Sequence, residues 1–156
     1  MARATFSIQA TALLLAALAL SPFASALGQA GEHIEGRWLT FDGDTKARRA
    51  LVDIRRQGPW FKGTIVELYL RPGEDPDPVC EECPGAARGK KIRGLEILSL
   101  EAGRDASEFQ GRVLDPEEGR VYRCTAVLEP GGKRLALRGY VVLPLFGRSE
   151  IWIRAQ

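Results

Sequence analysis

The cysteines are the residues whose type and spacing could most readily do chemistry. The chain holds three, and Cys80 and Cys83 form a C-x-x-C pair. Such a pair is redox-active when a helix N-terminus in a βαβ unit activates one thiol, and the surrounding sequence predicts neither feature. A zinc site would need two further ligands, and the single histidine, His33, is distant in sequence. We therefore expect a structural disulfide between Cys80 and Cys83, no metal, and a buried, inert thiol at Cys124.

Residues suited to acid–base or nucleophilic catalysis are sparse. A serine or cysteine nucleophile needs a neighbouring base, and His33 precedes the first predicted strand, where a frayed surface position is expected. Glu67 and Glu96 both lie within apolar strands, and an inward-facing pair of carboxyls would suit acid–base chemistry. Each is explained more simply as a solvent-facing residue or as the partner of an arginine. We expect no catalytic residues and no cofactor, with an enzyme as the minor alternative.

The first segment of the chain has the pattern of an export signal. Residues 8–20 form an apolar run, and Ala24-Ser25-Ala26 follows as a small-x-small cleavage site, with a second site at Ala30. The run is shorter than the ~20 residues that a membrane span needs. We expect a cleaved signal peptide over residues 1–26 and a mature single domain over residues 27–156, without a transmembrane span. The expected location is the periplasm or the medium, where a disulfide would persist.

The charge balance argues against nucleic acid as a partner. The chain has 22 Lys and Arg against 20 Asp and Glu, a formal net charge of +2 at pH 7. Basic residues come in pairs, such as Arg55-Arg56 and Lys90-Lys91, and not as a stripe that could follow a phosphate backbone. We read these pairs as solvated strand ends.

The strands that would position any site are clearest at the end of the chain. Residues 135–142 and 151–153 are apolar, β-branched and aromatic runs, separated by Leu-Pro-Leu-Phe-Gly. Pro144 and Gly147 cannot both lie within a regular ladder, which predicts strand, turn, strand. The partner expected for the last strand is the first one, which carries Gly36 and Trp38. Such pairing closes the sheet into a barrel and leaves no exposed edge.

Alternation and turn residues predict the remaining strands. The eight expected strands cover residues 34–41, 48–56, 60–70, 92–100, 108–114, 119–128, 135–142 and 151–153. Short hairpin links join most of them, so the predicted fold is an all-β, eight-stranded, antiparallel up-and-down barrel. Its interior would be just wide enough to be filled by side chains or to hold one small ligand.

Residues 71–91 differ from the rest. They contain four prolines, three glycines and a cluster of acidic residues, and they include the Cys80–Cys83 pair. We expect a long ordered loop pinned by the disulfide. Long loops inside small domains are often functional, for example as a lid at a barrel mouth. The acidic residues lack the spacing of an EF-hand and are expected to be solvated.

The chain resembles a family of small exported bacterial proteins known as domain of unknown function 2147. The matching landmarks are Ile34-Glu35-Gly36-Arg37-Trp38, Phe61-Lys62-Gly63-Thr64-Ile65-Val66, Ile92-Arg93-Gly94-Leu95-Glu96-Ile97-Leu98, Asp115-Pro116-Glu117-Glu118-Gly119-Arg120-Val121-Tyr122, Leu137-Arg138-Gly139-Tyr140, Gly147-Arg148 and Trp152-Ile153-Arg154. More distantly, the Gly36-x-Trp38 strand and the terminal Arg154 are similar to a lipocalin barrel. That resemblance implies that Trp38 closes the base and that Arg154 stacks on it as a cation–π cap.

The leading functional hypothesis is an exported, non-catalytic binding protein for a small hydrophobic or amphipathic, lipid-like molecule. Aromatic side chains line such cavities. The candidate wall residues are Phe61, Tyr69, Tyr122, Tyr140 and Trp152. For any single ring the alternative is a place in an ordinary filled core. The alternative for the protein is an envelope interaction or structural module that uses the 71–91 loop and has no ligand cavity.

Overall fold

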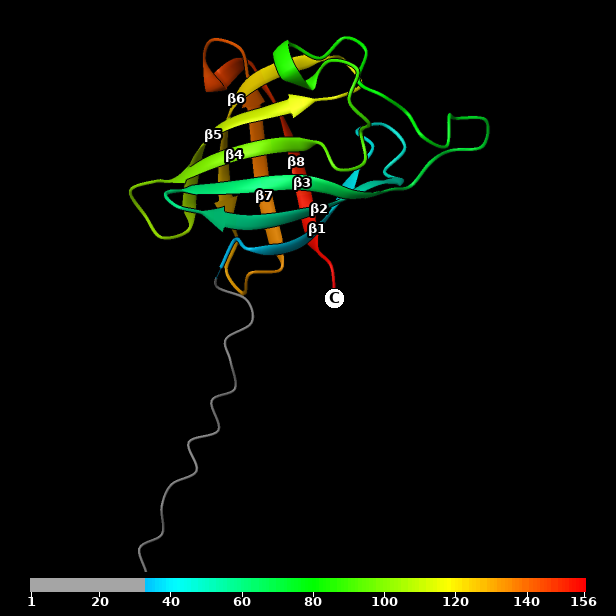
Figure 1. Cartoon of the computed structure of the whole chain (residues 1–156). Helices are drawn as coiled ribbons and strands as arrows, with labels where there is room; N and C mark the ends of the chain where they lie inside the picture. The colour runs from blue at the N-terminus through cyan, green and yellow to red at the C-terminus, as the bar shows by residue number, and fades with distance from the viewer. Residues whose placement is uncertain (1–32) are drawn as a thin grey trace, which may run out of the picture.

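Eight antiparallel strands follow one another around a closed barrel, and the last strand pairs with the first (Figure 1). The computed structural model describes residues 33–156, so the expected signal peptide over residues 1–26 lies outside the described residues. The strands are β1 (Gly36–Phe41), β2 (Arg48–Gln57), β3 (Trp60–Leu68), β4 (Glu96–Ala102), β5 (Glu108–Asp115), β6 (Arg120–Leu128), β7 (Arg134–Tyr140) and β8 (Gly147–Arg154). The predicted all-β, eight-stranded up-and-down barrel is confirmed.

Two 3₁₀ turns, η1 (Gly85–Ala87) and η2 (Pro144–Phe146), are the helical elements of the described residues. None of the helical structure between residues 33 and 156 is long and apolar enough to cross a membrane. We call the end at which β1 begins and β8 ends the base of the barrel. The opposite end, where β1 ends and β8 begins, is the mouth.

Most strand boundaries lie within two residues of the prediction, and the two that differ most do so for reasons visible in the backbone. The strand expected from residue 92 begins at Glu96, because residues 92–95 form a turn in which Gly94 has a φ of +89°. The last strand is longer than expected and begins at Gly147. A Cβ at Gly147 would lie 2.3 Å from the carbonyl oxygen of Gly139, so a glycine is needed for β8 to pair with β7 this early.

Alternate residues of the strands fill the barrel from the base. In β6, Cys124, Ala126 and Leu128 are buried while Arg123 and Val127 face solvent, as the alternation predicts. The largest fully buried side chains of the barrel strands are Trp38, Val52, Ile54, Leu98, Leu100 and Leu135. Burying a large apolar side chain contributes ~1.5–3 kcal/mol, so this cluster is the main source of the barrel's stability.

Gly36, Trp38 and Arg154 close the base. The guanidinium carbon of Arg154 lies 4.3 Å from the centre of the Trp38 ring, which is fully buried. A Cβ at Gly36, where φ is +123°, would lie 2.8 Å from Nη1 of Arg154, so the glycine leaves room for the guanidinium. The guanidinium also donates hydrogen bonds to the carbonyl oxygens of His33, Glu35 and Gly132. One arginine thus joins the segment before β1, the β6–β7 turn and the central tryptophan.

The segment between β3 and β4 is an ordered loop, held by the disulfide between Cys80 and Cys83. Both cysteines are buried, and Cys80 exchanges backbone hydrogen bonds with Gly89 and Lys90. The sulfur of Cys80 lies 3.3 Å from the carbonyl oxygen of Pro116 in the β5–β6 turn. The cysteines belong to the same apolar cluster as the barrel core. The predicted loop therefore packs on the mouth end of the barrel and does not extend freely into solvent.

Candidate functional site at the barrel mouth

Exposure rises along the inner wall from the base to the mouth. Trp38, Leu100 and Leu135 are 0% exposed. Towards the mouth, Val113 and Tyr122 face each other across β5 and β6 and are only half-buried. Solvent therefore enters the mouth half of the barrel between β5 and β8, whereas the base half is filled.

Gly139 provides the space on this side of the mouth. A Cβ built on it would lie 3.7 Å from Cβ of Tyr122 and 3.8 Å from a methyl carbon of Val113, with no closer neighbour. The three residues form a partly exposed surface on the inner wall, which we call the mouth recess. Its surface here is a methyl-bearing side chain, an aromatic ring and bare backbone, all of which suit an apolar part of a ligand.

Polar groups border the mouth recess on the neighbouring strands. Glu150 is two residues from the buried Trp152 and so shares its inner face, and its carboxylate accepts a hydrogen bond of 3.1 Å from the indole Nε1. On β1, the buried Thr40 hydroxyl accepts from the Ala50 amide at 3.0 Å. Arg148 stands opposite Gly139 and faces the same side of β8 as Glu150. The apolar wall therefore adjoins an inner guanidinium as well as an inner carboxylate.

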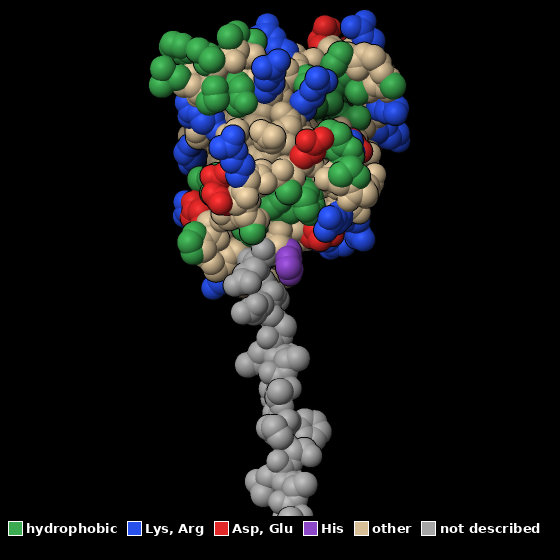
Figure 2. All heavy atoms as spheres, turned by 90° about the vertical axis from the view of Figure 1, so that its left-hand side faces the viewer, with side chains coloured by type: hydrophobic (Ala, Val, Ile, Leu, Met, Phe, Trp, Pro, Cys, Tyr) green, Lys and Arg blue, Asp and Glu red, His purple; other side chains and the backbone are tan. Residues whose placement is uncertain are grey.

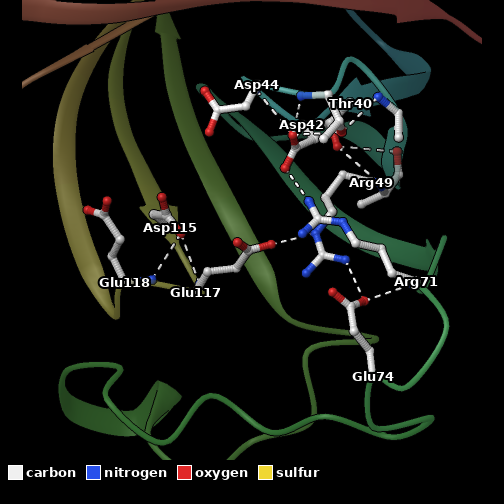
Figure 3. A network of polar contacts seen from close by, with 12 residues as sticks. Thr40, Asp42, Asp44, Arg49, Arg71, Glu74, Asp115, Glu117 and Glu118 are labelled. Carbon is white, nitrogen blue, oxygen red and sulfur yellow. Dashed lines mark hydrogen bonds and ion pairs between the residues drawn. The ribbon is translucent and has the colours of Figure 1, made fainter.

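A network of charged side chains crosses the mouth rim (Figure 3). Arg49 binds Glu74 of the β3–β4 loop at 2.7 Å and Glu117 of the β5–β6 turn at 2.5 Å. Arg71 of the same loop pairs with Asp42, which follows β1. The network therefore fastens the long loop to β1, β2 and the β5–β6 turn at once.

The surroundings of these groups change their acidity. The backbone amide and hydroxyl of Thr45, with help from Arg71, lower the pKa of Asp42 to about 2. The hydrogen bond from Arg49 lowers the pKa of Glu74. Tyr122 donates its hydroxyl to Glu118, and this bond to the protonated form raises the tyrosine pKa. At neutral pH Asp42 and Glu74 are charged and bound to arginine, and the phenol of Tyr122 is neutral.

The five predicted wall residues do not come together in one cavity. Phe61 lies near the base, edge-on to Phe109 with ring centres 5.2 Å apart. Tyr69 follows β3 and bonds through its amide to Arg49. Trp152 is buried in the filled half of the barrel. Tyr122 borders the mouth recess, whereas Tyr140 belongs to the outer wall.

Tyr140 lines a hollow of about 460 Å³ on the outside of the barrel. Arg112 and Arg123 stand opposite each other across β5 and β6 in the same hollow, and Trp60 lies at its far side. Most of the lining side chains, such as Ser99 and Gln110, alternate with the buried ones along their strands, which places the hollow on the solvent face.

The residues considered for catalysis are dispersed over the described part of the chain. Glu67 and Glu96 are exposed, and Glu96 pairs with Lys62 at 2.8 Å. His33 is exposed at the base, far from the mouth recess. Cys124 is fully buried, and desolvation raises its pKa to about 12. Among residues 33–156, no three metal-ligating side chains gather.

Sequence reasoning did not single out Val113, Gly139, Glu150, Thr40 or Arg49. Alternation is the signal that could have found Glu150, because it stands two residues before Trp152. The predicted last strand begins at residue 151 and excludes it. For Arg49 the sequence holds no such signal, since its partners are 25 and 68 residues away.

Comparison with known proteins gives a family and a fold. Residues 36–154 match the family described as "Uncharacterized protein conserved in bacteria (DUF2147)". A solved structure of protein HP1028 from Helicobacter pylori, described as belonging to the lipocalin family, superposes with a TM-score of 0.66. It is 14% identical and covers 80% of this chain and 84% of its own. No curated protein has a significantly similar sequence. The structural likeness supports a lipocalin-like barrel.

Proposed function

This chain belongs to the family of uncharacterized proteins conserved in bacteria that its residues 36–154 match, and on that premise we propose that it is an exported, non-catalytic binding protein. Its ligand is a small amphipathic molecule held at the mouth recess. The lipocalin-like barrel supports ligand binding in general terms, because barrels of eight strands have room for one small ligand. The signal-peptide pattern of residues 1–26 supports export.

The observation that carries the proposal is the contrast between the two halves of the interior. The base half is filled by side chains that are 0–2% exposed, such as Trp38 and Trp152. The mouth half keeps Val113, Tyr122 and Gly139 partly open to solvent. A ligand bound there would place its apolar part on this wall, and its polar part would meet Glu150 and the charged rim.

This position changes the chemistry expected of the ligand. A molecule enclosed by aromatic rings would be wholly hydrophobic, whereas the mouth recess presents a carboxylate at its opening. Glu150 accepts hydrogen bonds, so a hydroxyl, amine or amide donor on the ligand suits it. We therefore favour an amphipathic ligand whose polar part offers a donor to Glu150 and an acceptor to Arg148, which stands opposite Gly139.

The test is native mass spectrometry of protein recovered gently from an exporting bacterial host, followed by solvent extraction of any bound molecule. We expect a stoichiometric adduct in the wild type that denaturation releases. In Gly139→Leu, the added side chain occupies the recess and the adduct is lost. The matched control, Tyr140→Leu, alters the next residue on the outer wall and keeps the adduct.

Loss of the adduct in both variants, or in neither, would show that the ligand lies elsewhere. An apo mass for the wild type calls for a second measurement, in which the extracted lipids and metabolites of the host are added back. Failure of every fraction to bind would favour a barrel that acts through its surface.

A further inference from the structure

The β7–β8 connection carries an exposed apolar surface that neither the fold nor the mouth recess explains. Residues 141–146, which we call the tip, read Val-Val-Leu-Pro-Leu-Phe and contain no polar side chain. Their exposed fractions are 71% for Val141, 73% for Val142, 55% for Leu143, 77% for Leu145 and 78% for Phe146. Figure 2 shows hydrophobic side chains gathered at the upper left corner, at the end away from the base. Apolar surface of this kind marks an interaction site.

Hydrogen bonds satisfy three carbonyl groups of the tip. Arg138 donates Nε to the carbonyl oxygen of Pro144 at 2.5 Å and Nη2 to that of Leu145 at 3.0 Å. The amide of Phe146 donates to the carbonyl of Leu143 at 3.1 Å, and Pro144 has no N–H. Polar backbone groups must be paired within the protein when a segment leaves water for lipid. The carbonyl groups of Leu143, Pro144 and Leu145 meet this requirement.

The surroundings of the tip are cationic, both on the outer wall and at the rim of the mouth. The side chain of Arg148 is 91% exposed, and its nearest carboxylate, on Glu118, is 3.6 Å away. Arg123 stands opposite Tyr140 at the end of β7, and Arg112 stands opposite Arg123. Figure 2 shows Lys and Arg side chains next to the hydrophobic corner. Arginines beside an apolar tip match the phosphate groups of a bilayer surface.

We propose that the tip inserts into the interfacial region of a membrane that contains anionic lipids, with Arg123 and Arg148 against the lipid phosphates. A specific protein partner fits the same surface less well, because such interfaces use about one hydrogen bond per 100–200 Å², and the tip offers no side-chain donor or acceptor. A convex apolar segment also suits a deformable acyl layer. Since the tip is at the mouth end, insertion turns the mouth recess towards the bilayer. The proposal does not depend on the function proposed above.

The experiment is co-sedimentation of the full chain, produced in an exporting bacterial host, with vesicles of phosphatidylethanolamine and phosphatidylglycerol. We expect binding to these vesicles and weaker binding to vesicles of phosphatidylcholine alone. Leu145→Ser/Phe146→Ser removes two side chains that insert, and it lowers the partition coefficient at least ~10-fold. The matched control, Val121→Ser/Val127→Ser, changes two exposed valines on β6 and leaves binding unchanged.

A second measurement reports depth and remains informative if total binding is weak. A Phe146→Trp variant places an indole at the tip, and lipids brominated in the upper acyl chain quench its added emission. Equal binding of the tip variant and the control, or no quenching of the added indole, would overturn the proposal. So would a concentration-dependent dimer in sedimentation velocity that the tip variant abolishes, because a second copy would then be the occupant.

Discussion

Replacing Arg154 by alanine tests the account of how the base of the barrel is closed. The guanidinium lies 4.3 Å from the centre of a fully buried tryptophan ring, a contact worth ~1–2 kcal/mol when it is shielded from water. It also donates to three backbone carbonyls, and a hydrogen bond from a charged donor contributes ~1.5–3 kcal/mol when both groups are buried. The carbonyls lie near the surface and regain water in the variant, so we expect a total loss of about 3 kcal/mol.

Arg148→Ala is the matched control, because it makes the same change on the same strand where the side chain is 91% exposed and its ion pair spans 3.6 Å. Such pairs contribute ~0–1 kcal/mol. In urea unfolding followed by tryptophan fluorescence, the Arg154→Ala midpoint should fall by about 1.5 M for a slope of about 2 kcal/mol/M, and the Arg148→Ala midpoint should barely move. Arg154→Lys should lie between them, because it keeps a charge near the ring but not the planar fork. If Arg154→Ala and Arg148→Ala unfold at the same urea concentration, the guanidinium does not hold the base together.

Three further outcomes follow from the structure. Gly111→Ala should lower the free energy of unfolding in urea by more than ~2 kcal/mol, because its Cβ would lie 2.0 Å from the Ser99 carbonyl oxygen. Gly139→Ala, whose Cβ would lie 3.7 Å from its nearest neighbour, should change it by less than ~0.5 kcal/mol. Similar values for both would contradict the packing. The folded-state pKa values of Asp42 and Glu74 lie below their ordinary 3.8 and 4.5, so their contribution to the free energy of unfolding is present above about pH 4.5 and is lost as the pH falls towards 2. Proteolysis of the 71–91 loop should rise over this range. The rise should be less steep in Glu74→Gln, which has already lost the charge. Native protein should give no reaction with a thiol reagent at pH 8, because the Cys124 thiol is buried with its pKa raised to about 12 and the other two cysteines form a disulfide. Unfolded protein should react with one equivalent. A prompt reaction of the native protein would show that Cys124 is accessible.

The sequence was most informative where the structure depends on local pattern. The alternation of Cys124, Ala126 and Leu128 marks an inner face, and the pairing of the first and last strands follows from the need to leave no edge. Gly36, Trp38 and Arg154 are recognisable because a short motif and a resemblance point to the same end of the barrel. Fold class and base therefore follow from features within one or two strands.

The mouth depends on relations that the sequence does not display. Arg49 meets Glu74 and Glu117 only because the loop and the β5–β6 turn fold over the same rim, and these residues look like any other surface charges. The choice of five aromatic residues as a common wall did not consider parity, that is, whether each position along a strand faces the inside or the outside of the barrel. Tyr140 has the parity of Arg138, an outer residue, whereas Gly139 has that of the buried Leu137. Strand parity, applied residue by residue, would have separated them.

The order of the strands also constrains how the chain can become a finished protein. β1 matches β8 at two register positions, Trp38 with Arg154 and Leu39 with Ile153, whereas β7 matches β8 at seven. This short β1–β8 pairing joins residues over a hundred positions apart, so its entropic cost of loop closure is the largest of any strand pair. We therefore expect it to form last. Until Arg154 has been synthesised, or has emerged from a translocation pore, β1 has only β2 to pair with and Trp38 lacks its cap. Before that point the chain is an open sheet whose two edge strands are unpaired and prone to aggregation, so a chaperone would need to shield them.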